Sequence, residues 1–299
     1  MQKKILAIHF SQTGQLTDII RQLTGPLIEA GHSVEYVRVE PERAFNFPWT
    51  GKSFFAVMPD CVGEVPAKIL PFELKEKKYD LIILGYQAWF LSPSTCSNAI
   101  LLDQSFREVL KDTPVVTITG ARNMWIMAME RVKAKIKEAG GLLKGNIALV
   151  DKHANFVSFI TIFYWMFAGK KDRYLNIFPK PGVSDEDIRA CSEYGESILS
   201  KMETGNWDEL QPRLLEQKAT EVKYRLMFIE RKAKKIFGIW AGIIGKKKNK
   251  TAWLVAFKYY LIIALFVAAP IILTVDAIFF KPFLKNRIRN QMKYYSGVN

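Results

Sequence analysis

Short apolar runs alternate with segments of helical periodicity over the first two thirds of the chain. The apolar runs, each of which predicts a β-strand, are 4–10, 33–39, 80–85, 114–119 and 143–150. The periodic segments, each of which predicts a helix, are 15–30, 97–110, 123–139 and 184–203. Continuous apolar strands separated by helices indicate an α/β domain whose parallel sheet is covered on both faces.

The spacing of the five predicted strands favours a flavodoxin-like, doubly wound five-stranded parallel sheet of order 2-1-3-4-5 over residues 1–205. Such a sheet holds its ligand in a crevice at the carboxyl ends of strands 1 and 3. An aromatic insertion at 151–181 does not fit a minimal domain of this kind. We expect its run 156–168 to line an apolar substrate entrance or to insert into the membrane interface, with plain core packing as the alternative.

The rest of the chain forms a basic helical and membrane-anchoring extension. From Lys218 onward there are 17 basic and 3 acidic residues, so the net charge of +14 belongs to this part. Segment 206–250 predicts a basic juxtamembrane helix, with a solvated spacer helix as the alternative. Segment 251–281 predicts a transmembrane or re-entrant segment, with a buried core helix as the alternative, and a basic tail follows at 282–299.

Residues at both ends of the uncharged run 259–275 support the membrane assignment. Aromatic residues lie near its ends as in an interfacial belt, and basic residues flank it. These residues are Trp253, Tyr259, Tyr260, Phe279 and Phe280, and Lys246, Lys247, Lys248, Lys250, Lys281, Lys285, Arg287 and Arg289. Because the basic residues adjoin the apolar run, we expect them to bind anionic membrane lipids and no nucleic acid.

The first predicted strand leads directly into a hydroxyl-rich loop that opens a helix. Hydroxyls and free backbone amides at a helix N-terminus favour a phosphate, and Gly14 lets the backbone approach it closely. The mononucleotide loop of flavodoxins has the same residue types at its first, third and fourth positions, although Leu16 stands where its last Thr would be. The predicted FMN contacts in this loop are Ser11, Gln12, Thr13, Gly14, Gln15 and Thr17. An ordinary N-capped turn is the alternative.

Two further loops are expected to grip the ring of the same cofactor, FMN. The loop after the third strand offers Gln87, Ala88, Trp89 and Phe90, and the loop after the fourth offers Arg122, Asn123, Met124 and Trp125. Aromatic side chains could stack on the flavin, and an arginine near its N1/C2=O edge would stabilise the anionic reduced form. The alternatives are core packing for the two tryptophans and a surface ion pair for the arginine.

Few residues offer acid–base or metal chemistry. His153 follows the fifth predicted strand on the crevice side and is the candidate catalytic residue, whereas His9 is expected to be packed. The scattered histidines predict no metal site, and Cys61, Cys96 and Cys191 are expected to be reduced thiols. No signal peptide precedes the first strand, so we expect the domain on the cytoplasmic face of the inner membrane.

Four motifs occur in order within residues 3–203, namely the runs 8–16, 85–93, 122–125 and 181–188. Together they resemble the bacterial dialkylresorcinol condensing enzymes of the DarA type. The resemblance implies an aromatase-like step in lipid biosynthesis, in which a dialkyl cyclohexanedione loses two hydrogens to become a dialkylresorcinol of the flexirubin-type pigments. A flavin is a suitable acceptor for that oxidation. The resemblance also implies a lipophilic substrate and a ketosynthase-type partner enzyme.

Two other functions are compatible with the same fold. The first is a membrane-tethered NAD(P)H:quinone or flavin reductase, which would differ in being reduced rapidly by NAD(P)H. The second is a flavin-free scaffold that holds the ketosynthase at the membrane, and the departure at Leu16 favours it.

Overall fold

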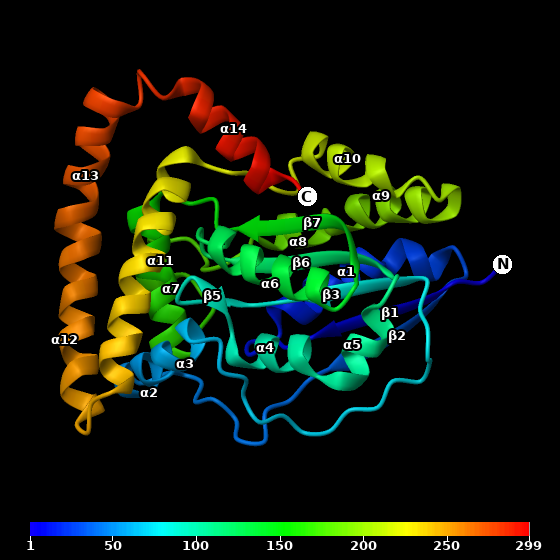
Figure 1. Ribbon diagram of the computed structural model, residues 1–299, viewed down its shortest axis with the longest axis horizontal. Helices are drawn as coiled ribbons and strands as arrows, with labels where there is room; N and C mark the ends of the chain where they lie inside the picture. The colour runs from blue at the N-terminus through cyan, green and yellow to red at the C-terminus, as the bar shows by residue number, and fades with distance from the viewer. Residues whose placement is uncertain (299) are drawn as a thin grey trace.

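The computed structural model describes residues 1–298 and contains a five-stranded parallel sheet (Figure 1). Its strands are β1 (Lys4–His9), β2 (Ser33–Arg38), β3 (Leu81–Gly85), β6 (Pro114–Ala121) and β7 (Leu142–Val150). They lie in the order β2-β1-β3-β6-β7, which confirms the predicted flavodoxin-like order. The strand order reverses between β1 and β3, and this places the crevice between their carboxyl ends.

Helices cover both faces of the sheet, as the continuous apolar strands predict. Alternate residues of β1 point to opposite faces, so Leu6 and Ile8 enter one core while Ile5 and Ala7 enter the other. The first core is covered by α4 (Thr95–Leu102), α5 (Gln104–Leu110) and α6 (Ile126–Glu138). The second is covered by α1 (Gln15–Glu29), α8 (Asp185–Arg189), α9 (Cys191–Thr204) and α10 (Leu210–Glu216).

Two of the predicted helices are each divided in two. The segment predicted at 97–110 breaks at Asp103, whose carboxylate accepts from the Phe106 amide at 2.9 Å and begins α5. The segment predicted from Ser184 breaks at Ala190, between α8 and α9. Local capping therefore overrides the longer periodic pattern.

A stretch between β2 and β3, for which the sequence predicts no element, adds a layer beside the sheet. It contains α2 (Gly51–Ala56) and α3 (Met58–Val62). The short hairpin strands β4 (Ala88–Trp89) and β5 (Ser92–Pro93) follow β3. Both additions lie at the carboxyl end of the sheet, where they build the site.

The C-terminal third is helical and packs along the domain (Figure 1). The helix α7 (Asn155–Ala168) and the short helices η1 (Tyr174–Asn176) and η2 (Trp207–Glu209) come before it in the chain. The elements of the C-terminal part then follow one another with no strand between them up to residue 298. They are α11 (Tyr224–Gly245), α12 (Lys250–Ile263), the π-helical turn η3 (Ala264–Ala268), α13 (Ala269–Val275), the π-helical turn η4 (Asp276–Phe280) and α14 (Lys285–Ser296). Because Met227, Glu230, Phe237 and Ile244 of α11 are buried, the solvated-spacer alternative is wrong.

The run from α12 through η4 is a continuous helix, Lys250–Phe280, with a mean hydropathy of 2.6 in its most apolar stretch. Within residues 1–298 it alone is long and apolar enough to cross a membrane. Only 6% of that stretch is buried, so the buried-core alternative is wrong for this segment.

Candidate flavin site

The loop between β1 and α1 has the features that an anion requires. Gly14, with φ of 86°, is the N-cap of α1, and no side chain accepts from the first amides of the helix. The hydroxyl of Ser11 is fully buried and has no hydrogen-bond partner. Unpaired buried hydroxyls are uncommon because each costs roughly 1–3 kcal/mol. An anion bound to the amides would supply the missing acceptor.

The other loop residues divide between the site and the interior. Gln12, Thr13 and Gln15 line the cavity described below. The Thr17 hydroxyl instead lies 2.8 Å from His9 Nε2, inside the domain, so the structure does not direct it toward the loop. Burial lowers the pKa of His9 to about 4, and the ring is therefore neutral. His9 is packed, as predicted.

Leu16 is a core residue that also lines the cavity described below. It is almost fully buried in the cluster between the sheet and α1. The helical turn that opens at Gly14 points this side chain at the sheet, near Gly85. Leu16, which stands where the flavodoxin loop has a threonine, therefore packs against the sheet.

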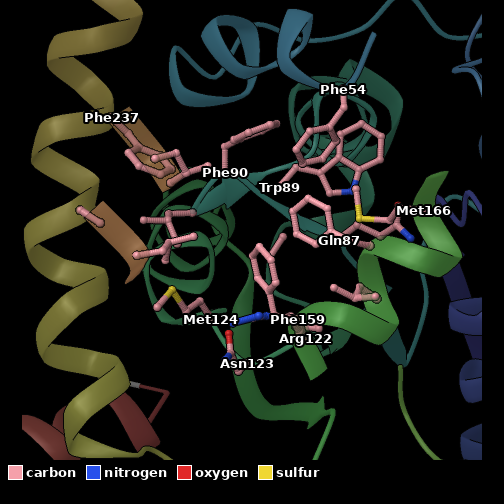
Figure 2. Close-up of a pocket in the computed structure, with 18 of the residues that line it drawn as sticks. Phe54, Gln87, Trp89, Phe90, Arg122, Asn123, Met124, Phe159, Met166 and Phe237 are labelled. Atoms are coloured by element: carbon pink, nitrogen blue, oxygen red, sulfur yellow. The ribbon is translucent and has the colours of Figure 1, made fainter. Parts of the chain in front are cut away.

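The two predicted ring loops meet at one cavity of about 430 Å³ (Figure 2). Both sets of residues line it, with Gln87, Ala88, Trp89 and Phe90 from one loop and Arg122, Asn123 and Met124 from the other. The side-chain carbonyl of Gln87 is buried without a partner, so it can accept from an N–H of a bound ring. The volume lies in the range of about 300–1,000 Å³ that is typical of small-molecule sites.

The two predicted tryptophans have different surroundings. Trp125 is 2% exposed in the core beneath the sheet and does not line the cavity, so its assignment to the cofactor is corrected. Trp89 lines the cavity within an aromatic wall. Its ring centroid lies 5.6 Å from that of Trp49 and 5.2 Å from that of Phe45. Trp125 is therefore a core residue, whereas Trp89 packs against the core and also lines the cavity.

α2 and the segment before it contribute site residues that the sequence analysis missed. Phe47, Trp49 and Phe54 line the cavity, and the Trp49 indole N–H donates to Gln12 Oε1 at 3.2 Å. The Trp49 amide also donates to the Met166 carbonyl in α7 at 2.8 Å. The density of aromatic residues over 45–55 was the available signal.

Arg122 is a cation without an ion-pair partner among residues 1–298, so the predicted alternative of a surface ion pair is wrong. Its Nη2 donates to Asn155 Oδ1 at 2.7 Å, and its guanidinium lies 5.7 Å from the Phe159 ring centroid. Burial lowers the pKa of Arg122, and nearby Asp151 opposes that shift. A half-buried guanidinium without an ion pair at a cavity wall attracts an anionic group.

Hydrogen bonds hold α7 next to this loop. They are made by Asn155, its first residue, and by Ser158, which contacts the buried Asp151. Asn155 Oδ1 also accepts from Asn123 Nδ2 at 2.7 Å, and Ser158 Oγ donates to Asp151 Oδ2 at 2.8 Å. His153, the candidate catalytic residue, is exposed and is not among the residues that line the cavity. The structure therefore brings Arg122 and Asn123 into the site and leaves His153 outside it.

Two charged residues of α11, neither of which the sequence analysis assigned to the site, hold both ring loops. Glu230 is fully buried, and its Oε1 accepts from the Met127 amide at 2.7 Å in the first turn of α6. Lys234 Nζ donates to Ser92 Oγ at 2.7 Å, just beyond the other loop. Burial raises the pKa of Glu230 to about 8 and lowers that of Lys234 to about 8. They act as positioning residues.

The far end of the cavity is apolar and is built from helices distant in sequence. α7, α11 and the long helix each contribute one face to it. In the long helix the lining residues recur every three or four positions, which puts them on one side. They are Leu261, Ala264, Leu265, Ala268, Ala269 and Ile272. A cavity with polar groups at one end and hydrocarbon at the other suits a ligand that has a polar part and an apolar part.

Comparisons with known proteins give no family assignment. No family model matches the chain, and no curated protein matches it. Solved structures similar to it include a flavoprotein from Lactobacillus acidophilus in complex with FMN, at 15% identity over 49% of this chain and 93% of that one, with a TM-score of 0.40. Another is a flavodoxin from the domain Archaea, at 11% identity over 67% of this chain and 99% of that one, with a TM-score of 0.38. Such low scores do not bear on function, and the flavodoxin-like class follows from the strand order.

Proposed function

We propose that the protein is an FMN-binding oxidoreductase that acts on a lipophilic substrate at a membrane surface. One observation carries the proposal: the open phosphate loop and both ring loops of a flavodoxin-like sheet meet at a single cavity. The unpartnered Ser11 hydroxyl and Gln87 carbonyl are the groups that a flavin mononucleotide would satisfy. The residues present therefore fit the cofactor.

Each part of the chain has a distinct task in this site. The α1 amides and Thr13 hold the phosphate, while Trp89 and the aromatic wall exclude water from the ring. Arg122 would stabilise negative charge that develops beside it, because it forms no ion pair with a carboxylate within residues 1–298. FMN, when bound, would accept a hydride, and the second hydrogen that the substrate loses would leave as a proton to water.

The substrate class follows from the other end of the cavity. A lipid with a polar ring can place the ring near Arg122 and its hydrocarbon chain along the apolar lining. We propose that the substrate is a dialkyl cyclohexanedione, oxidised to a dialkylresorcinol beside a ketosynthase-type partner. The four motifs shared with dialkylresorcinol condensing enzymes support this choice of ring.

FMN binding is tested by adding FMN to the full-length protein in mild detergent and recording the flavin absorption bands. Replacing Ser11→Ala should weaken binding about 10- to 100-fold, because a hydrogen bond to a charged group is worth about 1.5–3 kcal/mol. Thr95→Val is the matched control, since its hydroxyl is also buried and without a partner among residues 1–298 but lies at the start of α4, outside the loop between β1 and α1. Equal FMN affinity in both variants would refute the assignment of Ser11.

The substrate is tested on the FMN-loaded protein under anaerobic conditions. A dialkyl cyclohexanedione should bleach the flavin bands and yield a resorcinol, detected by mass spectrometry. NADPH alone should bleach them slowly. Rapid bleaching by NADPH with no reaction of the cyclohexanedione would identify a reductase instead.

A further inference from the structure

The long apolar helix, Lys250–Phe280, runs beside α11 at the edge of the molecule, and each of its ends contacts another part of the chain (Figure 1). Near its start, Phe257 is fully buried, and its ring centroid lies 6.1 Å from that of Phe55 in α2. Near its end, the one acidic residue of the helix, Asp276, is 4% exposed and accepts from the Tyr224 hydroxyl of α11 at 2.7 Å. The helix is therefore attached near its start to α2 and near its end to α11.

The chain returns to the domain after the helix ends. In α14, the Tyr294 hydroxyl donates to Glu130 of α6 at 2.8 Å, and Gln291 accepts from Arg231 of α11 at 2.7 Å. Gln211 of α10 donates to the carbonyl of Ser296 at 2.7 Å. A helix that crossed a bilayer would carry α14 to the far side of about 30 Å of hydrocarbon. These hydrogen bonds could not then form.

The outward face of the helix is a continuous strip of exposed apolar side chains. Its members are 41–62% exposed: Val255, Tyr259, Ile262, Ile263, Phe266, Val267, Ile271, Val275, Ile278, Phe279 and Phe280. Phe156 of α7 extends the strip, with its ring centroid 6.4 Å from that of Phe266. Extended apolar surfaces of this kind mark interaction sites.

Charge at the two ends of this strip identifies its partner. Lys246, Lys247, Lys248 and Lys250 precede the helix, and Lys281, Lys285, Arg287 and Arg289 follow it. Since α14 returns to the domain, both basic clusters stay on the side of the membrane that the domain occupies. An apolar strip with cations at both ends matches one leaflet of a bilayer with anionic headgroups.

We propose that the long helix lies in the plane of one leaflet instead of crossing the membrane. The outward strip is buried among acyl chains, and the basic clusters meet anionic headgroups. The proposal rests on the membrane attachment stated above and is independent of flavin binding. It also brings the apolar end of the cavity near the leaflet, because Phe159 lines the cavity and its ring centroid lies 5.1 Å from that of Phe266 in the outward strip.

Topology is tested with single exposed cysteines, Asn206→Cys before α10 and Asn290→Cys in α14. The native cysteines are buried and do not compete. After expression in a bacterium, a membrane-impermeant maleimide is added to spheroplasts and to inverted inner-membrane vesicles. We expect both positions to be labelled only in inverted vesicles. Labelling of the two positions from opposite sides would overturn the in-plane arrangement, whereas recovery in the soluble fraction would refute membrane attachment itself.

Depth distinguishes an in-plane helix from a re-entrant one, since both keep the ends on one side. Spin labels at Val267→Cys and Phe279→Cys, in vesicles containing anionic lipid, should report similar shallow depths from their oxygen and nickel accessibility. A label at Leu142→Cys in the sheet domain is the aqueous control. A much deeper position for 267 than for 279 would overturn the proposal.

Discussion

The sheet domain and the C-terminal helices differ in how they bury apolar surface. In the sheet domain α1 and α9 pack so closely that a Cβ on Gly195 would lie 2.2 Å from the Leu23 carbonyl oxygen. In α11 a Cβ on Gly238 would meet nothing within 4 Å, and the long helix leaves most of its apolar surface exposed. The sheet domain covers its apolar residues with its own helices, while the long helix leaves an apolar face uncovered. The cavity lies where the two regions meet.

The largest effect is expected when the exposed apolar face is charged. The triple variant Ile263→Arg, Val267→Arg and Ile271→Arg should reduce partitioning into anionic vesicles by at least about 100-fold, because each side chain loses roughly 1.5–3 kcal/mol of burial. Co-sedimentation measures the bound fraction.

The matched control for that variant carries the same charges on the sheet domain. Ile28, Leu102 and Leu142 are 40–47% exposed, and their replacement by Arg should leave partitioning unchanged. Equal losses in both triple variants would show that the two regions do not differ in membrane contact.

Replacing a glycine by alanine in each region should show how tightly that region is packed. Gly195→Ala should lower the free energy of unfolding by about 2–3 kcal/mol, since its Cβ overlaps backbone and α1 must move. Gly238→Ala should raise it by about 0.5–1 kcal/mol through helix propensity. Thermal unfolding followed by circular dichroism compares them, and a destabilising Gly238→Ala would show that α11 packs more tightly than described.

The smallest effect concerns the contact between the regions and depends on pH. Because the pKa of Glu230 is raised to about 8, the folded protein binds more protons than the unfolded one, and stability falls as pH rises from about 5 to 8. Lys234, with its pKa lowered to about 8, has the opposite effect, so stability recovers above pH 8.

Glu230→Gln keeps an acceptor for the Met127 amide and should flatten the fall between pH 5 and 8 by at least about 1 kcal/mol. Lys234→Met should remove the recovery at higher pH and leave the fall in place. Melting temperatures measured from pH 5 to 10 test both. Parallel curves for the parent protein and Glu230→Gln would contradict the buried-carboxyl account.

Prediction from sequence succeeded where contacts are local or periodic. The five strands, their order and the two ring loops follow from short runs of residues, and Arg122 and Asn123 do line the cavity. Trp125 was assigned to the site because a loop pattern does not show which way a side chain points. Trp49 and Phe54 were missed because the stretch between β2 and β3 has no periodicity.

The sequence by itself determined that this chain forms a flavodoxin-like parallel sheet with an apolar, basic-flanked C-terminal segment, because apolar periodicity and charge are properties of neighbouring residues. Only the tertiary structure decided that this segment lies along the domain and closes the cavity. The contacts that place it, such as Asp276 with Tyr224 and Phe257 with Phe55, join residues 52 and 202 positions apart. No local pattern encodes pairings at that separation, because they arise from packing of the whole chain.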